Sequence, residues 1–167
     1  HAVNTAQRAL NKDVTRSTTA TSPLPGAPAG QDWQAFRAQF LAKSDLPLRV
    51  NEHLLRVYGA RAEEVIAFAR ERNLDTVIDE PSGLIAAEVP WSFEREGART
   101  LADIVARRTM VGLGPSVGIG ADEAIAKVAQ SELGWDQERA DKEVASYRTW
   151  VARYQPRVLT TVTAASS

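Results

Sequence analysis

The sequence predicts an all-α protein, an irregular orthogonal bundle of five to seven helices preceded by a proline-rich extended linker. Apolar residues recur three and four positions apart through most of residues 31–155, and no stretch shows sustained period-two alternation. Glycine, proline and capping residues separate these periodic segments at helix-length intervals. With 167 residues, 44% hydrophobic and 25% charged, the chain is long enough for one domain with its own core.

The two ends of the chain lack this pattern. Residues 2–10 have helical spacing, but one short helix is marginal in water. Residues 11–30 are rich in Thr, Ser, Pro and Gly, which is typical of an extended linker. We expect residues 156–167 to be a disordered tail. The folded helical domain is therefore predicted to span residues 31–155.

The first half of that domain contains three predicted helices. Asp32 is a plausible N-cap for the first, in which aromatic residues recur from Trp33 onward. Pro47 suits the start of the second, and Gly59 suits its end. Residues 61–72 repeat the helical pattern, with acids early and arginines late, as the helix dipole favours.

The middle of the chain is less regular. Residues 73–82 form a connector that includes a short extended piece, DTVID. Residues 83–97 have a helical pattern, but an interior proline, Pro90, is expected to kink or split that helix. The next helix begins at Thr100, a good N-cap, with Asp103 at the third helical position of a capping box. Asp103 also precedes Arg107 by four residues, the favourable order for a helical ion pair.

The last part of the domain contains two predicted helices after a glycine-rich loop at residues 110–120. The first begins at Ala121 and is stopped by Gly134. The second runs from about Asp136 to Tyr154, before Pro156. These helices could be aligned with a helix-turn-helix. However, the second opens with DQERADKE, in which acids outnumber bases, so DNA binding is not expected.

Composition excludes several classes of function. The chain has no cysteine, which excludes disulfides, a thiolate nucleophile and a zinc–thiolate site. A formal net charge of −1 argues against general nucleic-acid binding. No apolar run approaches the roughly 18 residues of a membrane-spanning helix, and the first residues lack the pattern of a signal peptide. Because the chain opens with His1 and not Met, we expect a piece of a longer polypeptide.

Candidate catalytic groups are few. His53 has no second histidine or carboxylate at a metal-ligand spacing, so we expect a surface or half-buried structural histidine. The four glycines of residues 112–120 precede a helix, but their spacing matches no phosphate-binding loop. A structural turn is therefore favoured over anion binding. No catalytic, cofactor-binding or metal-binding residue is assigned.

Charged residues are concentrated between residues 88 and 108. Two readings remain open for them, an acid–base pair or an ion-paired face, and the second is favoured because acids and arginines alternate. We expect Arg107 or Arg108 to pair with Glu96 or Glu88 on the neighbouring helix and to fix the angle between the two helices. The residues to which we assign this structural role are Glu88, Glu96, Thr100, Asp103, Arg107 and Arg108.

Three segments together resemble the C-terminal helical domain of FAD-dependent glycerol-3-phosphate dehydrogenases: LLRVYGARAEEVIAFAR, AAEVPWSFEREGARTLADIVARRTM and AIAKVAQSELGWDQERADKEVASYRTWV. SPLPGA also resembles the segment that joins the flavin domain to this domain in that family. Val57 departs from the pattern, since the family often has Arg there. The matching positions are Tyr58, Gly59, Glu88, Glu96, Ala98, Thr100, Leu101, Asp103, Arg107, Arg108, Thr109, Leu133, Gly134, Trp135 and Tyr147.

This resemblance implies a non-catalytic cap whose parent enzyme oxidises sn-glycerol 3-phosphate to dihydroxyacetone phosphate through FAD, with electrons passing to a quinone or to oxygen. Residues 1–30 would be the tail of the flavin domain and the linker. The fragment itself would carry no cofactor, would contact the upstream FAD-binding domain, and could self-associate through the surface left uncovered. A cytoplasmic location is implied, with the parent on the inner face of the cell membrane. The alternative is an independent helical interaction or regulatory module, without nucleic-acid binding.

Overall fold

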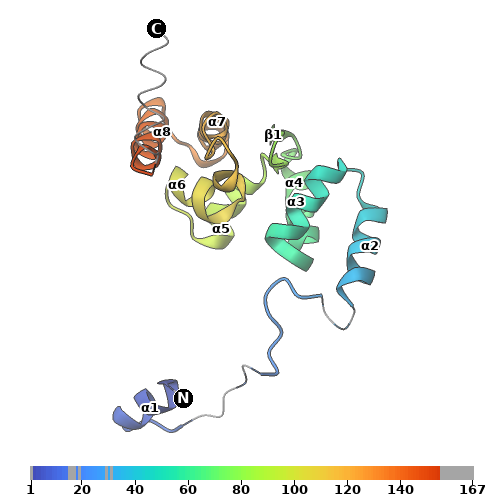
Figure 1. Ribbon diagram of the computed structural model, residues 1–167, viewed down its shortest axis with the longest axis vertical. Coiled ribbons are helices and arrows are strands. Elements are labelled where there is room, and N and C mark those ends of the chain that lie inside the picture. The colour runs from blue at the N-terminus through green and yellow to red at the C-terminus, as the bar shows by residue number, and fades with distance from the viewer. Residues whose placement is uncertain (1, 15–17, 19, 29, 31, 155–167) are drawn as a thin grey trace.

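The computed structural model describes residues 2–14, 18, 20–28, 30 and 32–154, and the predicted all-α class is confirmed there (Figure 1). A two-stranded antiparallel sheet accompanies the helices. The predicted tail at residues 156–167 lies outside the described residues. The elements are α1 (Ala2–Ala9), α2 (Trp33–Lys43), α3 (Leu48–Tyr58), η1 (Gly59–Arg61), α4 (Ala62–Arg72), β1 (Val77–Asp79), β2 (Leu84–Ile85), α5 (Glu88–Glu96), α6 (Leu101–Asp103), η2 (Ile104–Arg108), η3 (Val111–Leu113), α7 (Ala121–Leu133) and α8 (Gln137–Ala152).

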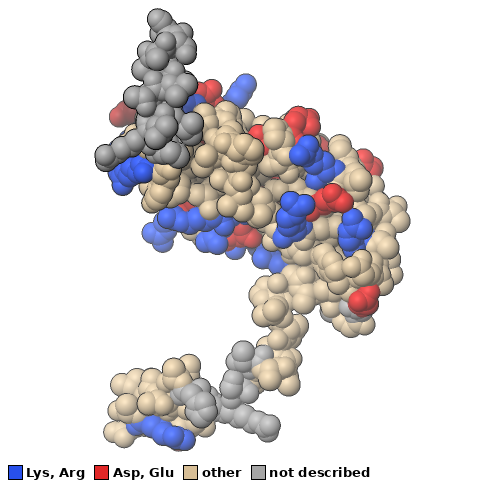
Figure 2. All heavy atoms as spheres, viewed as in Figure 1, with Lys and Arg blue, Asp and Glu red and all other residues tan. Residues whose placement is uncertain are grey.

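Helix α1 lies well apart from the other helices (Figures 1 and 2). It has no buried residue, so it adds nothing to the hydrophobic core. The linker segment that follows does contact the body, at Gly26. The N–H of Ala60 donates to the carbonyl of Gly26 at 2.7 Å. A Cβ on Gly59 would lie 2.3 Å from that same carbonyl oxygen, so this close approach of two backbones requires glycine.

Helices α2, α3 and α4 surround a first hydrophobic core. Asp32 caps α2 as predicted, accepting from the N–H groups of Gln34 and Ala35. The large residues of this core are Phe36, Phe40, Leu54, Leu55, Tyr58, Val65, Ile66, Phe68, Ile85 and Trp91. The ring of Trp91, from α5, meets those of Tyr58 and Phe68 edge-on. The burial of these aromatic side chains holds α5 against the three helices.

The prediction of a helix over residues 83–97 was wrong at its start. Leu84 and Ile85 form β2, which pairs with β1, and α5 begins only at Glu88. Successive strand side chains point to opposite sides, so Ile85 enters the first core and Leu84 enters a second one. Pro90 lies in the first turn of α5, where backbone N–H groups have no helical partner, so it neither kinks nor splits the helix.

The second core lies between α5, η2, α7 and α8. Its large residues are Leu84, Val89, Leu101, Ile104, Val105, Ile125, Trp135, Tyr147 and Val151. Asp136 caps α8, and Gly134 ends α7 in the left-handed conformation, as predicted. Because β1, β2 and α5 contribute to both cores, the segments from Val77 to Asp79 and from Leu84 to Trp91 join the two halves.

Candidate functional site

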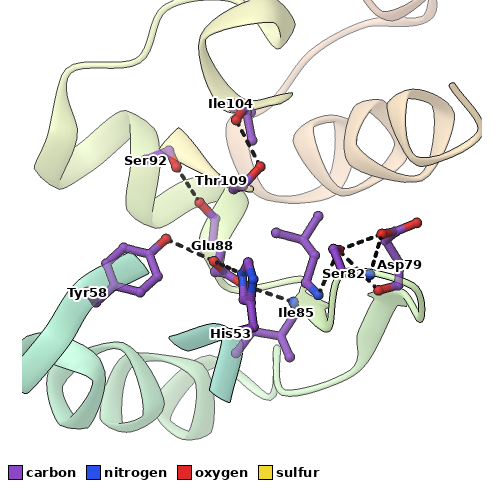
Figure 3. Close-up of polar contacts among 10 residues, drawn as sticks. His53, Tyr58, Asp79, Ser82, Ile85, Glu88, Ser92, Ile104 and Thr109 are labelled. Atoms are coloured by element: carbon purple, nitrogen blue, oxygen red, sulfur yellow. Dashed lines mark hydrogen bonds and ion pairs between the residues drawn. The ribbon is translucent and has the colours of Figure 1, made fainter. Parts of the chain in front are cut away.

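Glu88 is a fully buried carboxylate at the junction of the two cores (Figure 3). Nε2 of His53 lies 2.9 Å from Oε2 and 3.1 Å from Oε1. The Tyr58 hydroxyl donates to Oε2 and the N–H of Ile85 donates to Oε1, each at 3.0 Å. An unpaired buried carboxylate would be strongly destabilising, so these three donors are what allow Glu88 to be buried here.

The position of His53 corrects the expectation of a surface or half-buried histidine, since its side chain is only 3% exposed. His53 and Tyr58 both lie on α3, and they reach the same carboxylate from successive turns (Figure 3). Sequence spacing could not reveal the pair, because Glu88 is 35 residues further along the chain. The result is a polar clamp that holds α3 against α5.

The phenol of Tyr58 is buried in this clamp, and burial raises its pKa far above the ordinary value, with a further contribution from the charge of Glu88. Tyr58 therefore keeps its proton throughout the working pH range. Its hydroxyl serves as a permanent hydrogen-bond donor to Glu88. This geometry suits a structural network better than an acid–base pair.

A cavity of about 660 Å³ opens beside the clamp, and His53 forms part of its wall. Its lining comes from three segments: the face of α3 that carries Arg49 and Arg56, the turn between β1 and β2, and the loop at residues 110–116. Polar and apolar side chains are mixed along this wall. The cavity touches the buried clamp through His53 and opens to the surface.

The capping box expected at Thr100 and Asp103 is present. Burial raises the pKa of Asp103, but the N–H of Arg99, the Thr100 hydroxyl and Arg107 together lower it below its ordinary value. Arg107 forms the predicted i, i+4 ion pair with Asp103, and among the described residues it forms no ion pair with Glu96 or Glu88, the alternative that we had also expected. The carboxylate of Glu143, from α8, also accepts from the N–H of Leu101 at 2.8 Å, a long-range contact that the sequence did not indicate.

The other charged residues of this region contact different partners from those predicted. Glu96 pairs with Arg61, 3.9 Å away. Arg108 forms no ion pair with a described residue, but its positive charge acts to lower the pKa of Glu96. Burial raises the pKa of Glu96. Glu94 accepts two hydrogen bonds from Arg72, at 2.7 and 3.0 Å, and so joins α4 to α5. Basic and acidic side chains both appear on the visible face of the body (Figure 2).

A second buried carboxylate, Asp122 in α7, was missed by the sequence analysis. It accepts from Nε of Arg148 at 2.7 Å and from the N–H of Gly120 at 2.8 Å. Burial raises its pKa, but the hydrogen bonds from Arg148 and from backbone amides outweigh that effect and lower it. Asp122 and Arg148 are 26 residues apart, so the local sequence pattern could not indicate their contact.

The glycine-rich loop consists of turns and the short helix η3. The Tyr147 hydroxyl donates to the carbonyl of Val117 at 2.5 Å and so ties the loop to α8. Among the described residues, no group of three or more His, Asp or Glu side chains could hold a metal ion, and no described helix is long and apolar enough to cross a membrane.

A family model of the C-terminal domain of alpha-glycerophosphate oxidase matches residues 17–140. This chain belongs to that family. The match includes the linker contact at Gly26, the clamp around Glu88 and the capping box at Thr100. It does not favour the alternative of an independent interaction module.

Curated relatives agree with the family assignment. Glycerol-3-phosphate dehydrogenase of Mycobacterium leprae (strain TN) is 39% identical over 115 residues, which are 68% of this chain and 19% of the relative. The enzyme of the same name from Synechocystis sp. is 30% identical over 149 residues, 85% of this chain and 26% of the relative. The mitochondrial glycerol-3-phosphate dehydrogenase of Schizosaccharomyces pombe is 26% identical over 146 residues, 71% of this chain and 22% of the relative. No solved structure gives a significant match.

The chain thus spans between 19% and 26% of the length of these relatives. It corresponds to a C-terminal helical domain of larger glycerol-3-phosphate dehydrogenase-like proteins.

Proposed function

We propose that this chain is the non-catalytic helical cap of an enzyme that oxidises sn-glycerol 3-phosphate to dihydroxyacetone phosphate. The names of the relatives and the family match at residues 17–140 support the proposal. In the parent protein FAD would supply the hydride-accepting chemistry on an upstream domain, with a quinone or oxygen as the final acceptor. The first 30 residues would then be the end of that domain and the linker.

The described residues do not themselves fit a flavin. A dinucleotide site needs a parallel sheet and a glycine-rich turn between a strand and a helix. The described sheet has only β1 and β2, which are antiparallel, and no strand leads into the glycine-rich loop before α7. The buried carboxylates Glu88 and Asp122 are each fully engaged by donors from this chain. These features support a scaffold rather than a reaction site.

The partner that this scaffold would contact is the upstream flavin domain. Large apolar side chains on the surface support this proposal, among them Leu24, Ile119 and Tyr154, which are 77%, 39% and 71% exposed. Contact with another domain would remove them from water. In the isolated chain the same side chains would promote self-association. The parent would be a cytoplasmic protein at the inner face of the membrane, where a quinone is accessible.

The test of the proposal uses the 167-residue chain and the parent polypeptide. FAD and glycerol 3-phosphate are added to the chain, and flavin retention after gel filtration and reduction of an artificial electron acceptor are measured. We expect neither with the chain alone and both with the parent. A purified chain that stays yellow and bleaches when glycerol 3-phosphate is added would contradict the proposal.

A further inference from the structure

The cavity beside the clamp has the features of a binding site that the cap function does not require. We propose that it binds a phosphate monoester through Arg49, Arg56 and Nδ1 of His53. This inference concerns the chain itself and does not depend on the activity of the parent. The three residues share one face of α3, because positions 49, 53 and 56 are four and three residues apart.

The buried imidazole is the first observation that indicates a ligand. Nε2 of His53 is committed to the carboxylate of Glu88. Nδ1 has no hydrogen-bond partner among the described residues. Described polar atoms that lack a partner and are completely shielded from solvent form a separate group, and Nδ1 is not one of them, so it is not completely shielded. Because His53 lines the cavity and is otherwise buried, Nδ1 is the polar atom that it presents there. The clamp therefore fixes the ring in one orientation. Because Nε2 donates to Glu88, Nδ1 donates to a phosphate oxygen when the imidazole carries a second proton, and it accepts from a phosphate hydroxyl when it does not.

The charges of the cavity are the second observation. Arg49 and Arg56 are exposed, and neither forms an ion pair with a described residue. Both carboxylates of the wall accept hydrogen bonds, but only Glu52 is paired with a cation, so the lining keeps a net positive charge from its two arginines against Asp79. Glu52 pairs with Arg37 at 3.0 Å, and Asp79 accepts from the N–H and the hydroxyl of Ser82, at 3.0 and 2.5 Å.

Two guanidinium groups without a partner are thus left around the exposed imidazole nitrogen. Guanidinium groups bind phosphate oxygens in a bidentate manner, and these hydrogen bonds are stronger than those between neutral groups. The charge of the site therefore favours an anion that offers several oxygens.

The opposite wall indicates that the anion carries an organic group. It is formed by Met110, Leu113 and Pro115, with the hydroxyl of Ser116 beside them. Leu48 closes the α3 side and is 61% exposed. A volume of about 660 Å³ exceeds that of a phosphate ion and lies within the range of small-molecule sites. The phosphate would lie against α3 and the ester group against the loop.

The experiment follows the two imidazole nitrogens by ¹⁵N NMR while inorganic phosphate and then glycerol 3-phosphate are added at constant ionic strength. His1 and His53 are the two histidines of the chain, so His1 provides an internal control. We expect a saturable shift of Nδ1 of His53, tighter binding of the ester than of inorganic phosphate, and no shift with glycerol. Absence of a saturable shift at His53 with either phosphate would overturn the proposal.

Charge-removing variants show where the anion binds. Arg49→Gln and Arg56→Gln change exposed side chains, so the fold should persist. Each should weaken binding about tenfold, the loss expected for one charge-assisted contact. Arg153→Gln, which removes the same charge from an exposed position at the end of α8, should leave binding unchanged. Equal weakening by all three variants would mean non-specific charge attraction and would refute the site.

The same phosphate monoester chemistry occurs in soluble metabolites and in the headgroup of phosphatidic acid. Co-sedimentation with phosphatidylcholine vesicles, with and without phosphatidic acid, distinguishes these sources. Binding to the acidic vesicles that is lost in Arg49→Gln assigns the site to a lipid headgroup. Saturable NMR binding of glycerol 3-phosphate without vesicle binding assigns it to a soluble monoester.

Discussion

The carboxylate of Glu88 lies 2.9 Å from Nε2 of His53, and this contact joins α5 to α3 at the point where the two cores meet. The same carboxylate receives the Tyr58 hydroxyl and the N–H of Ile85. Three groups, two from α3 and one from β2, thus depend on one side chain of α5. The arrangement between the halves of the domain is set by this carboxylate as well as by apolar packing.

Removing the clamp should be strongly destabilising. In Glu88→Ala, three buried donors lose their acceptor, and breaking a buried pair of this kind costs about 3–5 kcal/mol. Glu94→Ala is a matched control, because Glu94 lies on the same helix as Glu88. It forms an exposed bidentate pair with Arg72 of α4, which is worth about 0–1 kcal/mol. Urea unfolding of both variants gives the comparison. Similar free energies of unfolding for the two would show that the clamp is not the joint between the halves.

The elements of this domain could be predicted from local sequence, whereas the clamp could not. Asp32, Gly134 and Asp136 indicate helix ends through their own backbone and side-chain preferences, and the structure has them in those roles. Local pattern was misleading at Leu84 and Ile85, because a two-residue strand buried on both faces looks like part of a helix. The partners of Glu88 and Asp122 lie 35 and 26 residues away, a separation at which helix periodicity carries no information.

The capping box should account for a measurable part of the stability. Asp103→Ala removes the acceptor for the N–H groups of Arg99 and Thr100 and should cost about 0.5–2 kcal/mol. Arg107→Ala removes only the ion pair, from a side chain that is 63% exposed, and should cost less. Melting temperatures of the two variants test this order. A larger loss in Arg107→Ala would show that the ion pair dominates over the cap.

Stability at acid pH should depend on Arg148. Its contact lowers the pKa of Asp122 below the ordinary 3.8, so the folded state binds that proton less readily than the unfolded state does. The resulting stabilisation of the folded state is fully present at pH values above the ordinary pKa of 3.8. It is lost as the pH falls through the lowered pKa of Asp122.

Arg148→Gln should therefore lower the free energy of unfolding at neutral pH, and that free energy should fall less steeply than in the unaltered chain between about pH 5 and pH 2. Denaturant unfolding at a series of pH values provides the measurement. Parallel pH profiles for the two proteins would exclude a role for this pair.

Gly118 should tolerate no side chain. It has φ +76°, and an added Cβ would lie 2.3 Å from Cγ1 of Val105 in the second core. Gly97 also has a positive φ, +69°, but nothing lies within 4 Å of its added Cβ. Gly97→Ala should thus cost only the conformational penalty of about 1–2 kcal/mol, and Gly118→Ala should cost about 1–3 kcal/mol more through overpacking. Equal losses in chemical denaturation would mean that the loop shifts freely away from Val105.

The contact of the linker at Gly26 should be separable from the folding of the helical body. A Cβ on Gly26 would lie 2.7 Å from the carbonyl oxygen of Tyr58, whereas one on Gly30 meets nothing within 4 Å. Both glycines have a positive φ, so the two alanine variants share the backbone penalty and differ only in the clash. Gly26→Ala should release the segment and accelerate its cleavage in limited proteolysis, while the melting temperature of the body changes little. Faster cleavage in Gly30→Ala as well would attribute the effect to backbone strain. Unchanged cleavage in Gly26→Ala would show that the hydrogen bond from Ala60 to Gly26 does not hold the linker in place.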